Sequence, residues 1–152
     1  GKNINLVLIG EDTEIDRTIV EKISDPLTHI VRNAADHGIE ENLERTAVGK
    51  SSDGTVTIRA FQRSGRVIIE ISDDGRGMDP DYIFKKAIDK GLVDSNAELS
   101  ATEKLSLIFL PGFSTAQKGS SLSGRGVGMD VVKKNISEVG GRVFFESKKG
   151  RG

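Results

Sequence analysis

Two β-branched segments separated by a short turn constrain the fold of this chain more than any other feature. The segments are GTVTIRAFQ at residues 54–62 and RVIIEIS at residues 66–72, with RSG between them. Runs rich in Val, Ile and Thr favour extended strands, and a short glycine-containing connection favours antiparallel pairing of the two. The sequence therefore predicts a β-hairpin near the middle of the chain.

Patterns on either side of the hairpin predict further strands and helices. INLVLIG at residues 4–10 predicts a buried first strand, and RVFFESKK at residues 142–149 predicts a last one. Apolar residues at helical spacing, bounded by Asp-Pro, Pro-Gly or Gly-Gly, are typical of surface helices. Such segments follow the hairpin at residues 78–91, 102–110 and 127–139.

Two helices are also predicted between the first strand and the hairpin. The first begins with Thr13 as its N-cap, and isoleucines recur at every fourth position after it. The second begins with Asp25 as N-cap and Pro26 at the first helical position, and it stops at Gly38. Residues 39–53 are polar and are expected to be irregular.

The order of these elements predicts an α/β fold. Helices on one face of a mixed, mostly antiparallel sheet, a two-layer α/β sandwich, are the economical packing for this order. A chain of 152 residues without an internal repeat is expected to form a single domain, residues 1–152. Because a glycine turn follows the last predicted strand, we expect the chain to be cut before a returning strand.

Composition excludes several classes of function. With 22 basic and 23 acidic residues the net charge is −1, which gives no electrostatic reason to expect nucleic acid or an anionic membrane as a partner. No apolar run approaches the roughly 18 residues of a membrane span, and the N-terminus lacks a signal-peptide pattern. The absence of cysteine excludes disulfides and thiolate metal sites, and it agrees with a cytoplasmic location.

The predicted helix at residues 26–37 has an unusual polar face. At about 100° per residue, His29, Asn33, Asp36 and His37 fall on one side. This face is either an ordinary solvated surface or the wall of a ligand site. In a ligand site an asparagine oxygen suits Mg²⁺ and the histidines suit phosphate or proton transfer. Zinc is disfavoured, because the two histidines are eight residues apart and no third ligand accompanies them.

The segment ISDDGRGMDP, residues 71–80, follows the second strand of the hairpin. Three interpretations are open: a tight turn, a calcium loop or the wall of a pocket. A calcium loop is disfavoured, because Asp81 stands where a bidentate glutamate belongs. In a pocket, Asp73 could accept a hydrogen bond from an exocyclic amine, and Gly75 and Gly77 would let a flat ring approach the backbone.

The third motif is SGRGVGMDVV, residues 123–132. Gly124, Gly126 and Gly128 lead into a predicted helix, whose N-terminal amides could bind phosphate, although a flexible linker would look similar. The glycine spacing does not fit a dinucleotide-binding fold. A Walker A loop is also excluded, since Glu44 stands where its first glycine should be.

The order of these motifs resembles the Bergerat, or GHKL, family of ATP-binding proteins. That family comprises histidine kinases, gyrase B-type topoisomerases, the ninety-kilodalton heat-shock chaperone and mismatch-repair MutL proteins. Within it, the chain looks most like the ATP-binding catalytic domain of chemotaxis sensor histidine kinases. The likeness spans nearly the whole chain and rests on DPLTHIVRNAADHGIE, DDGRGMD, LIFLPGFSTA and SGRGVGMDVVKKNI.

The resemblance implies roles for individual residues, with ATP and Mg²⁺ as cofactors. Asn33 would be the Mg²⁺ ligand, Asp73 would bind the adenine amine, and residues 112–126 would form a lid over ATP. The implied catalytic residues are His29, Arg32, Asn33 and His37. The implied nucleotide contacts are Asn33, Asp36, Asp73, Gly75, Gly77, Met78, Phe109, Phe113, Ser114, Thr115, Gly124, Arg125, Gly126, Val127, Gly128 and Met129.

The resemblance also implies a reaction and a set of partners. The reaction is transfer of the ATP γ-phosphate to a histidine on a separate phosphotransfer domain of the same kinase, acting in trans. A coupling protein and a chemoreceptor array would act through the parent protein, and response regulators would act downstream. The alternatives are a Bergerat ATPase and a regulatory nucleotide-binding module. Because family ATPases carry Glu where this chain has His29, efficient hydrolysis is disfavoured.

Overall fold

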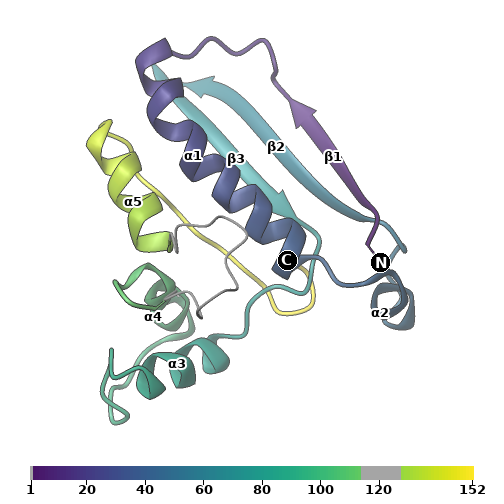
Figure 1. Ribbon diagram of the computed structural model, residues 1–152, viewed down its shortest axis with the longest axis vertical. Helices are drawn as coiled ribbons and strands as arrows, with labels where there is room; N and C mark the ends of the chain where they lie inside the picture. The colour runs from purple at the N-terminus through teal and green to yellow at the C-terminus, as the bar shows by residue number, and fades with distance from the viewer. Residues whose placement is uncertain (1, 114–127) are drawn as a thin grey trace. The chain divides into compact units, whose positions relative to one another are not determined.

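The computed structural model describes residues 2–113 and 128–152 and divides into two compact units. The first unit comprises Gly1–Glu21, Ile30–Gly77 and Lys148–Gly152, and the second comprises Lys22–His29 and Met78–Ser147. The prediction of a single domain stays a prediction. The elements, labelled in Figure 1, are β1 (Ile4–Ile9), α1 (Arg17–Asn33), η1 (Ala34–Gly38), α2 (Asn42–Ala47), β2 (Gly54–Arg63), β3 (Arg66–Asp73), α3 (Pro80–Asp89), α4 (Ala101–Ser106), η2 (Leu107–Phe109) and α5 (Met129–Glu138).

The first unit contains a three-stranded sheet in the order β1-β2-β3. β1 pairs with β2 in parallel, from Ile4↔Gly54 onward, and β2 pairs with β3 antiparallel in a longer ladder. The predicted hairpin is confirmed, and its turn is Ser64-Gly65. Both turn residues have positive φ, 52° and 75°, as a turn that follows the right-handed twist of its strands requires. Helices together with a mixed sheet confirm the predicted α/β class.

The helix α1 corrects two predictions about the segment before the hairpin. Its N-cap is Asp16, whose side chain accepts from the Thr18 amide at 2.8 Å. Thr13 instead donates to the carbonyl of Ala60 at 3.1 Å. The helix also runs through Pro26 without a restart. The buried side chain of Ile23 lies one turn before the buried Pro26, and burial of this face outweighs the missing hydrogen bond of one proline.

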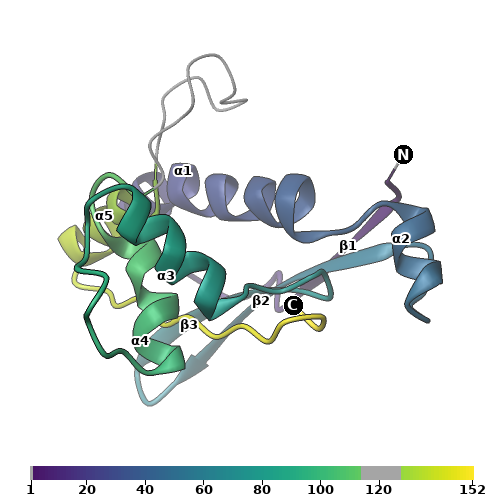
Figure 2. The same cartoon turned by 90° about the horizontal axis from the view of Figure 1, so that it is seen from below.

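The segment after α1 also differs from the prediction. Ala34–Gly38 forms a π-helix, which closes with the Ile39 amide donating to the Ala34 carbonyl at 2.8 Å. The short helix α2 occupies part of the segment predicted to be irregular. Figure 2 shows α2 beside the start of β1, where the Asn3 amide donates to the Asn42 side chain at 3.2 Å.

In the second unit the helices α3, α4 and α5 begin within two residues of the predicted starts. Asp79 caps α3 by accepting from the Asp81 amide at 3.0 Å. Ser100 and Glu103 form a reciprocal capping box at the start of α4. These helices and the segments beside them enclose a hydrophobic core whose buried members are Ile83, Ala87, Leu105, Leu107, Ile108 and Phe113.

The predicted last strand is wrong in the described structure. Residues 141–148 have no regular secondary structure, and the Phe144 side chain is 85% exposed. A strand exists only through hydrogen bonds to a neighbouring strand, so β-branched and aromatic residues do not form one alone.

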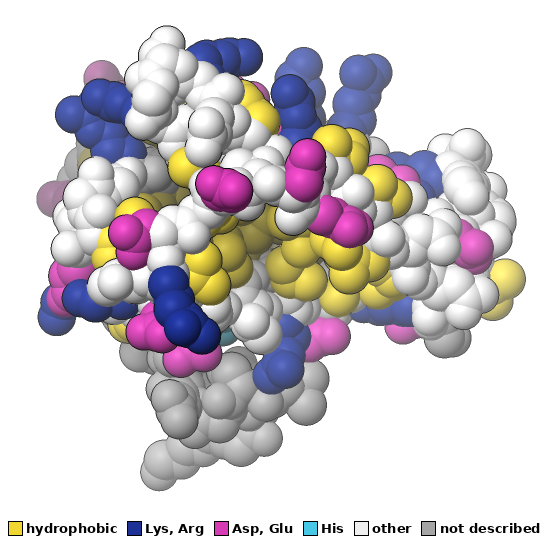
Figure 3. Space-filling view, turned by 90° about the horizontal axis from the view of Figure 1, so that it is seen from above, with side chains coloured by type: hydrophobic (Ala, Val, Ile, Leu, Met, Phe, Trp, Pro, Cys, Tyr) yellow, Lys and Arg dark blue, Asp and Glu magenta, His cyan; other side chains and the backbone are white. Residues whose placement is uncertain are grey.

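Some large hydrophobic side chains stay on the surface, among them Leu43. The first strand is not buried as predicted, because Leu6 and Leu8 of β1 are also exposed. On the face drawn in Figure 3, hydrophobic side chains lie among both acidic and basic ones. This mixture agrees with the nearly even charge count of the sequence. No helix in the described ranges is long and apolar enough to cross a membrane.

Candidate functional site

Asp73 is the last residue of β3, and its carboxylate is held by the turn that follows. Its Oδ1 accepts from the Gly75 amide at 2.9 Å. This is the local bond by which an aspartate stabilises a turn two residues on. The residue is half-buried, and no described residue donates to its Oδ2. The Asp73 carboxylate is therefore oriented by the hydrogen bond to Oδ1, and its Oδ2 can accept a hydrogen bond from a ligand.

Gly75 and Gly77 are glycines because other backbone segments approach them closely. A Cβ at Gly75 would lie 2.0 Å from the Gly38 carbonyl oxygen. That oxygen also accepts from the Arg76 amide at 2.8 Å. Gly77 has φ +67°, and a Cβ there would lie 2.0 Å from the Lys148 carbonyl oxygen. The closest approach at each glycine is thus made by protein backbone, and the role beneath a base stays a prediction.

The polar residues of α1 and of the π-helix are only partly arranged as predicted. His29 and Asn33 lie one turn apart in α1, and Arg32 is exposed. Asp36 and His37, both exposed, fall in the π-helix. A π-helix advances by i to i+5 bonding, so the 100° spacing does not extend beyond Asn33. The helical spacing used for the predicted polar face therefore holds only from His29 to Asn33, and the position of Asp36 and His37 on this face stays a prediction.

The π-helix nevertheless ends beside Asp73. A Cβ at Gly38 would lie 3.5 Å from Oδ1 of that aspartate. Lys2 binds the same segment, since its ammonium donates to the Asp36 carbonyl at 2.7 Å and to the Ala35 carbonyl at 3.2 Å. Short π-helical segments are frequent at functional sites. The structure thus places Gly38, at the end of the π-helix that follows Asn33, beside the Asp73 carboxylate that is predicted to bind adenine.

A partly buried cluster of charges lies behind this turn, and the sequence did not reveal it. The cluster comprises Glu40, Arg45, Lys50 and Asp74, which we call the Glu40 network. Arg45 and Glu40 are 1% and 6% exposed. Arg45 donates to Glu40 Oε1 at 2.9 Å through Nη1 and to Asp74 Oδ2 at 3.0 Å through Nη2. Lys50 donates to Glu40 Oε2 at 2.7 Å.

The charge state of Glu40 follows from these partners. Burial acts to raise the pKa of its carboxyl, but the hydrogen bond from Lys50, a backbone hydrogen bond and the charges of Lys50 and Arg45 together hold this pKa below its ordinary value. Glu40 is therefore ionised at neutral pH. The only sequence signal of the network was the set of charged residues in segment 39–53, which was expected to be irregular.

In the second unit, the predicted contact residues have structural roles. Phe109 makes an edge-to-face contact with Phe145, with ring centroids 6.2 Å apart. Phe113 is 5% exposed. The ammonium of Lys86 lies 4.9 Å from the centre of the Phe113 ring, and Lys90 donates to the Phe113 carbonyl. Burial and the neighbouring charge of Lys86 lower the pKa of Lys90.

The remaining predicted contacts of this unit lie at the ends of elements. The Met78 amide donates to the Ser147 hydroxyl at 2.8 Å, and the Met78 side chain is exposed. Gly128 is the N-cap of α5, and Met129 packs against the core. The rest of the predicted phosphate and lid contacts lie outside the described residues: Ser114, Thr115, Gly124, Arg125, Gly126 and Val127.

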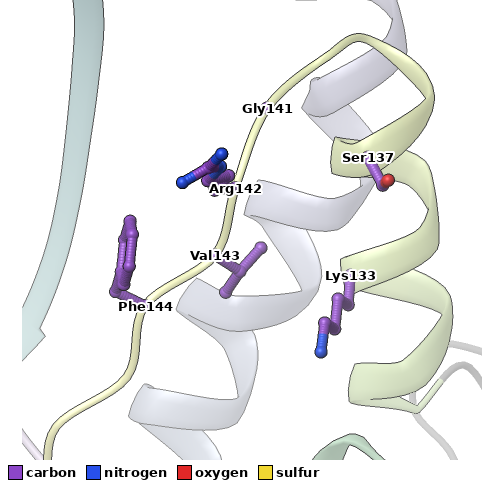
Figure 4. Close-up of a pocket in the computed structure, with 6 residues that line it drawn as sticks. All are labelled: Lys133, Ser137, Gly141, Arg142, Val143 and Phe144. Carbon is purple, nitrogen blue, oxygen red and sulfur yellow. The ribbon is translucent and has the colours of Figure 1, made fainter.

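Neither of two surface pockets coincides with the predicted site. One, of about 280 Å³, is lined by Lys133 and Ser137 of α5 and by residues 141–144. Figure 4 shows Val143 directed toward α5 and Phe144 directed away from it. The other, of about 510 Å³, lies in the first unit around Thr13 and Phe61. Within residues 2–113 and 128–152, no group of three or more His, Cys, Asp or Glu side chains could hold a metal ion.

The chain is an α/β protein in which the turn after β3 places the Asp73 carboxylate beside the end of the π-helix. The chain belongs to the family of histidine kinase-, DNA gyrase B- and HSP90-like ATPases, whose sequence model matches residues 22–152.

Individual relatives are more specific than the family. The chain is 51% identical over 152 residues to chemotaxis protein CheA of Rhizobium meliloti (strain 1021), covering 100% of the chain and 20% of that protein. It is 52% identical over 151 residues to chemotaxis protein CheA of Cereibacter sphaeroides, covering 99% and 22%. It is 49% identical over 154 residues to sensor histidine kinase CheAY of Helicobacter pylori (strain ATCC 700392 / 26695), covering 100% and 19%. The chain thus spans about a fifth of the length of these relatives.

Proposed function

We propose that this chain is the ATP-binding part of a chemotaxis sensor histidine kinase. It binds ATP with Mg²⁺, and the γ-phosphate passes to a histidine on a separate phosphotransfer domain of the same kinase. The observation that supports this most strongly is identity of about one half, along the whole chain, to proteins named chemotaxis protein CheA. The anchored carboxylate of Asp73 supplies the acceptor that an adenine amine needs.

The donor set of the first unit fits Mg²⁺ bound together with phosphates. Mg²⁺ takes oxygen ligands and usually keeps several waters beside one or two protein ligands and substrate phosphates. A single carboxamide oxygen, that of Asn33, meets this requirement, and the described residues offer no larger acidic cluster that would hold the ion alone. In this proposal His29, Arg32 and His37 donate to the phosphates, and Asp36 belongs to the same set of nucleotide contacts.

The transfer forms one bond and breaks one. A ring nitrogen of the acceptor histidine attacks the γ-phosphorus, and the bond to the oxygen that bridges the β- and γ-phosphates breaks, so that ADP leaves. Mg²⁺ held by Asn33 would neutralise charge on the phosphate oxygens. The residues of this chain orient the nucleotide and stabilise the developing charge, and positioning of this kind supplies most of the acceleration. His29 and His37 belong to the nucleotide wall, so the acceptor comes from elsewhere.

The remaining contacts and partners complete the proposal. We propose residues 112–126 as the lid predicted from the family resemblance. The proposed phosphate-side contacts lie outside the described residues: Ser114, Thr115, Gly124, Arg125, Gly126 and Val127. Gly128 and Met129 follow them at the start of α5. In the cytoplasm, a coupling protein and chemoreceptors act on the parent protein, and response regulators take the phosphate from the acceptor.

Incubation with ATP, Mg²⁺ and a histidine phosphotransfer domain tests the function. We expect acid-labile, base-stable phosphate on the acceptor and none on an acceptor that lacks its histidine. Free phosphate without phosphorylated acceptor would contradict the proposal in favour of an ATPase. Nucleotide binding without either product would contradict it in favour of a regulatory module.

A further inference from the structure

The Glu40 network ends on the backbone that flanks Asp73. The Lys50 ammonium donates to the Asp74 carbonyl at 3.0 Å and to the Gly75 carbonyl at 2.7 Å, in addition to Glu40. Arg45 donates to the Asp74 carbonyl at 3.1 Å through Nη1. Two cations thus converge on the two peptide groups that follow the carboxylate.

Further bonds fix the network to the rest of the first unit. Asp74 Oδ1 accepts from the Thr55 amide at 2.8 Å, which ties the turn to β2. Arg45 Nε donates to the Ser51 carbonyl at 2.7 Å. All buried side-chain nitrogen and oxygen atoms in the described part of the chain have partners. Lys50 thus uses all three of its N–H donors and Arg45 four of its five, so little donor capacity is left for a second arrangement.

The network also connects the turn to the segment that carries Asn33. Glu40 follows Gly38 by two residues, and the Gly38 carbonyl accepts from the Arg76 amide at 2.8 Å. One end of the connection is thus the π-helix after Asn33 and the other is the turn after Asp73. A displacement of Glu40 would therefore shift the π-helix and the turn relative to one another.

Stability alone does not account well for such a network. Buried ion pairs lose most of their Coulombic gain to desolvation, and hydrophobic residues of similar volume often serve stability equally well. Buried hydrogen-bonded charges do hold one geometry, because any displacement leaves a charge without a partner. Here the geometry held is that of the Asp74 and Gly75 peptides, and Gly75 in turn orients Asp73 through its amide.

We infer that Glu40, Arg45 and Lys50 are positioning residues that hold the Asp73 carboxylate in the orientation that distinguishes adenine from guanine. The inference rests on the proposed function, because it gives Asp73 a base to bind. Its distinctive consequence concerns the preference for one base over another, which a merely stabilising role would not affect in molecules that remain folded.

Lys50→Met tests the inference, because it keeps the aliphatic stem and removes the three donors. Dissociation constants for ATP and GTP are measured by displacement of a fluorescent nucleotide from folded protein. We expect the preference for ATP over GTP to fall about tenfold, as for the loss of a hydrogen bond to a charged group. Asp73→Ala is the reference and should lower the preference at least as much. An unchanged preference in Lys50→Met would overturn the inference.

A second variant separates positioning from folding. In Glu40→Gln combined with Lys50→Met, one negative and one positive charge are removed together, and the Arg45–Asp74 pair stays. We expect this double variant to be more stable than Lys50→Met, because the negative charge that lost its Lys50 partner is removed as well. The base preference should remain low, since the two carbonyls still lack the ammonium. Recovery of the preference with the stability would overturn the inference.

Lys104→Met is the matched control. Lys104 forms an ion pair with Asp81 at 2.9 Å in the second unit, and its loss should leave the base preference unchanged within about twofold. An equal fall in this control would overturn the inference.

The proposed function fails separately, if the unsubstituted protein binds ATP but phosphorylates no acceptor. The base preference of Lys50→Met then still decides the inference, because it is read from binding.

Discussion

At the scale of single residues, one carbonyl oxygen determines much of the candidate site. The Gly38 oxygen lies where a Cβ at position 75 would be, and it accepts from the Arg76 amide. A side chain at position 75 would move the turn away from the π-helix. Contact between two backbone segments therefore requires glycine at position 75, whether or not this residue also contacts a nucleotide.

Gly75→Ala should accordingly destabilise the protein. We expect a loss of about 2 kcal/mol, because overpacking of a close contact typically costs 1–3 kcal/mol. Gly91→Ala is the control: no heavy atom lies within 4 Å of a Cβ there, and its φ of +72° adds only left-handed strain, about 1 kcal/mol. Urea unfolding of both variants measures the difference. Equal losses would contradict the steric requirement at position 75.

Asn33→Ala should separate catalysis from binding. If its side-chain oxygen holds Mg²⁺, the substitution affects the phosphates and leaves the adenine contact in place. We expect phosphotransfer to fall by about a hundredfold or more, and the affinity for ADP measured without Mg²⁺ to change by less than about threefold. Equal losses of phosphotransfer and of metal-free binding would contradict the assignment.

At the scale of elements, turn and cap residues predicted most ends of helices and strands. The predictions failed where packing against distant residues determines the structure. The hairpin and the starts of α3 and α4 follow from turn and cap residues that act within a few positions. The continuity of α1 through Pro26 does not, because it depends on which face of the helix is buried. The π-helix and α2 also have no short-range signal in the sequence.

The position of the α1 cap can be tested directly. Asp16→Ala should lower the free energy of unfolding by about 1 kcal/mol, since loss of an N-cap leaves a first-turn amide without its acceptor. Hydrogen exchange at the Thr18 amide should become faster. Glu21→Ala is the control, because its contact with Arg17 is long, 4.0 Å, and exposed, and such pairs contribute at most about 0.5 kcal/mol. Similar losses in both variants would argue against Asp16 as the cap.

At the scale of the whole molecule, the family and its general chemistry were predictable, whereas the support of the site was not. The site roles of Asp73 and Asn33 stay predictions, which rest on a carboxylate at the end of a strand, an amide on a helix and the family resemblance. Glu40, Arg45 and Lys50 were missed because charged residues in a polar segment are usually solvated. Only three-dimensional contact shows that these side chains are buried and paired.

This buried network gives the stability of the protein a particular pH dependence. Because the folded pKa of Glu40 is lowered from 4.5, its contribution is fully present above that value and is lost as the pH falls through the folded pKa. Glu40→Gln should cost roughly 3 kcal/mol at about pH 7, as for a broken buried ion pair. Guanidinium unfolding from about pH 7 down to about pH 3 should show the difference between the two proteins shrinking. A difference that stays constant with pH would exclude Glu40 as its source.

The hairpin tip has a practical consequence. Ser64 and Gly65 are exposed, and nothing lies within 4 Å of the position that a Cβ would take on Gly65. The ladder closes just before them, at Arg63↔Arg66. Exposed tips of this kind accept inserted sequence, because no buried backbone bond has to break. A fluorescent reporter with flexible linkers inserted between Ser64 and Gly65 would mark this protein in a living cell without interrupting either strand.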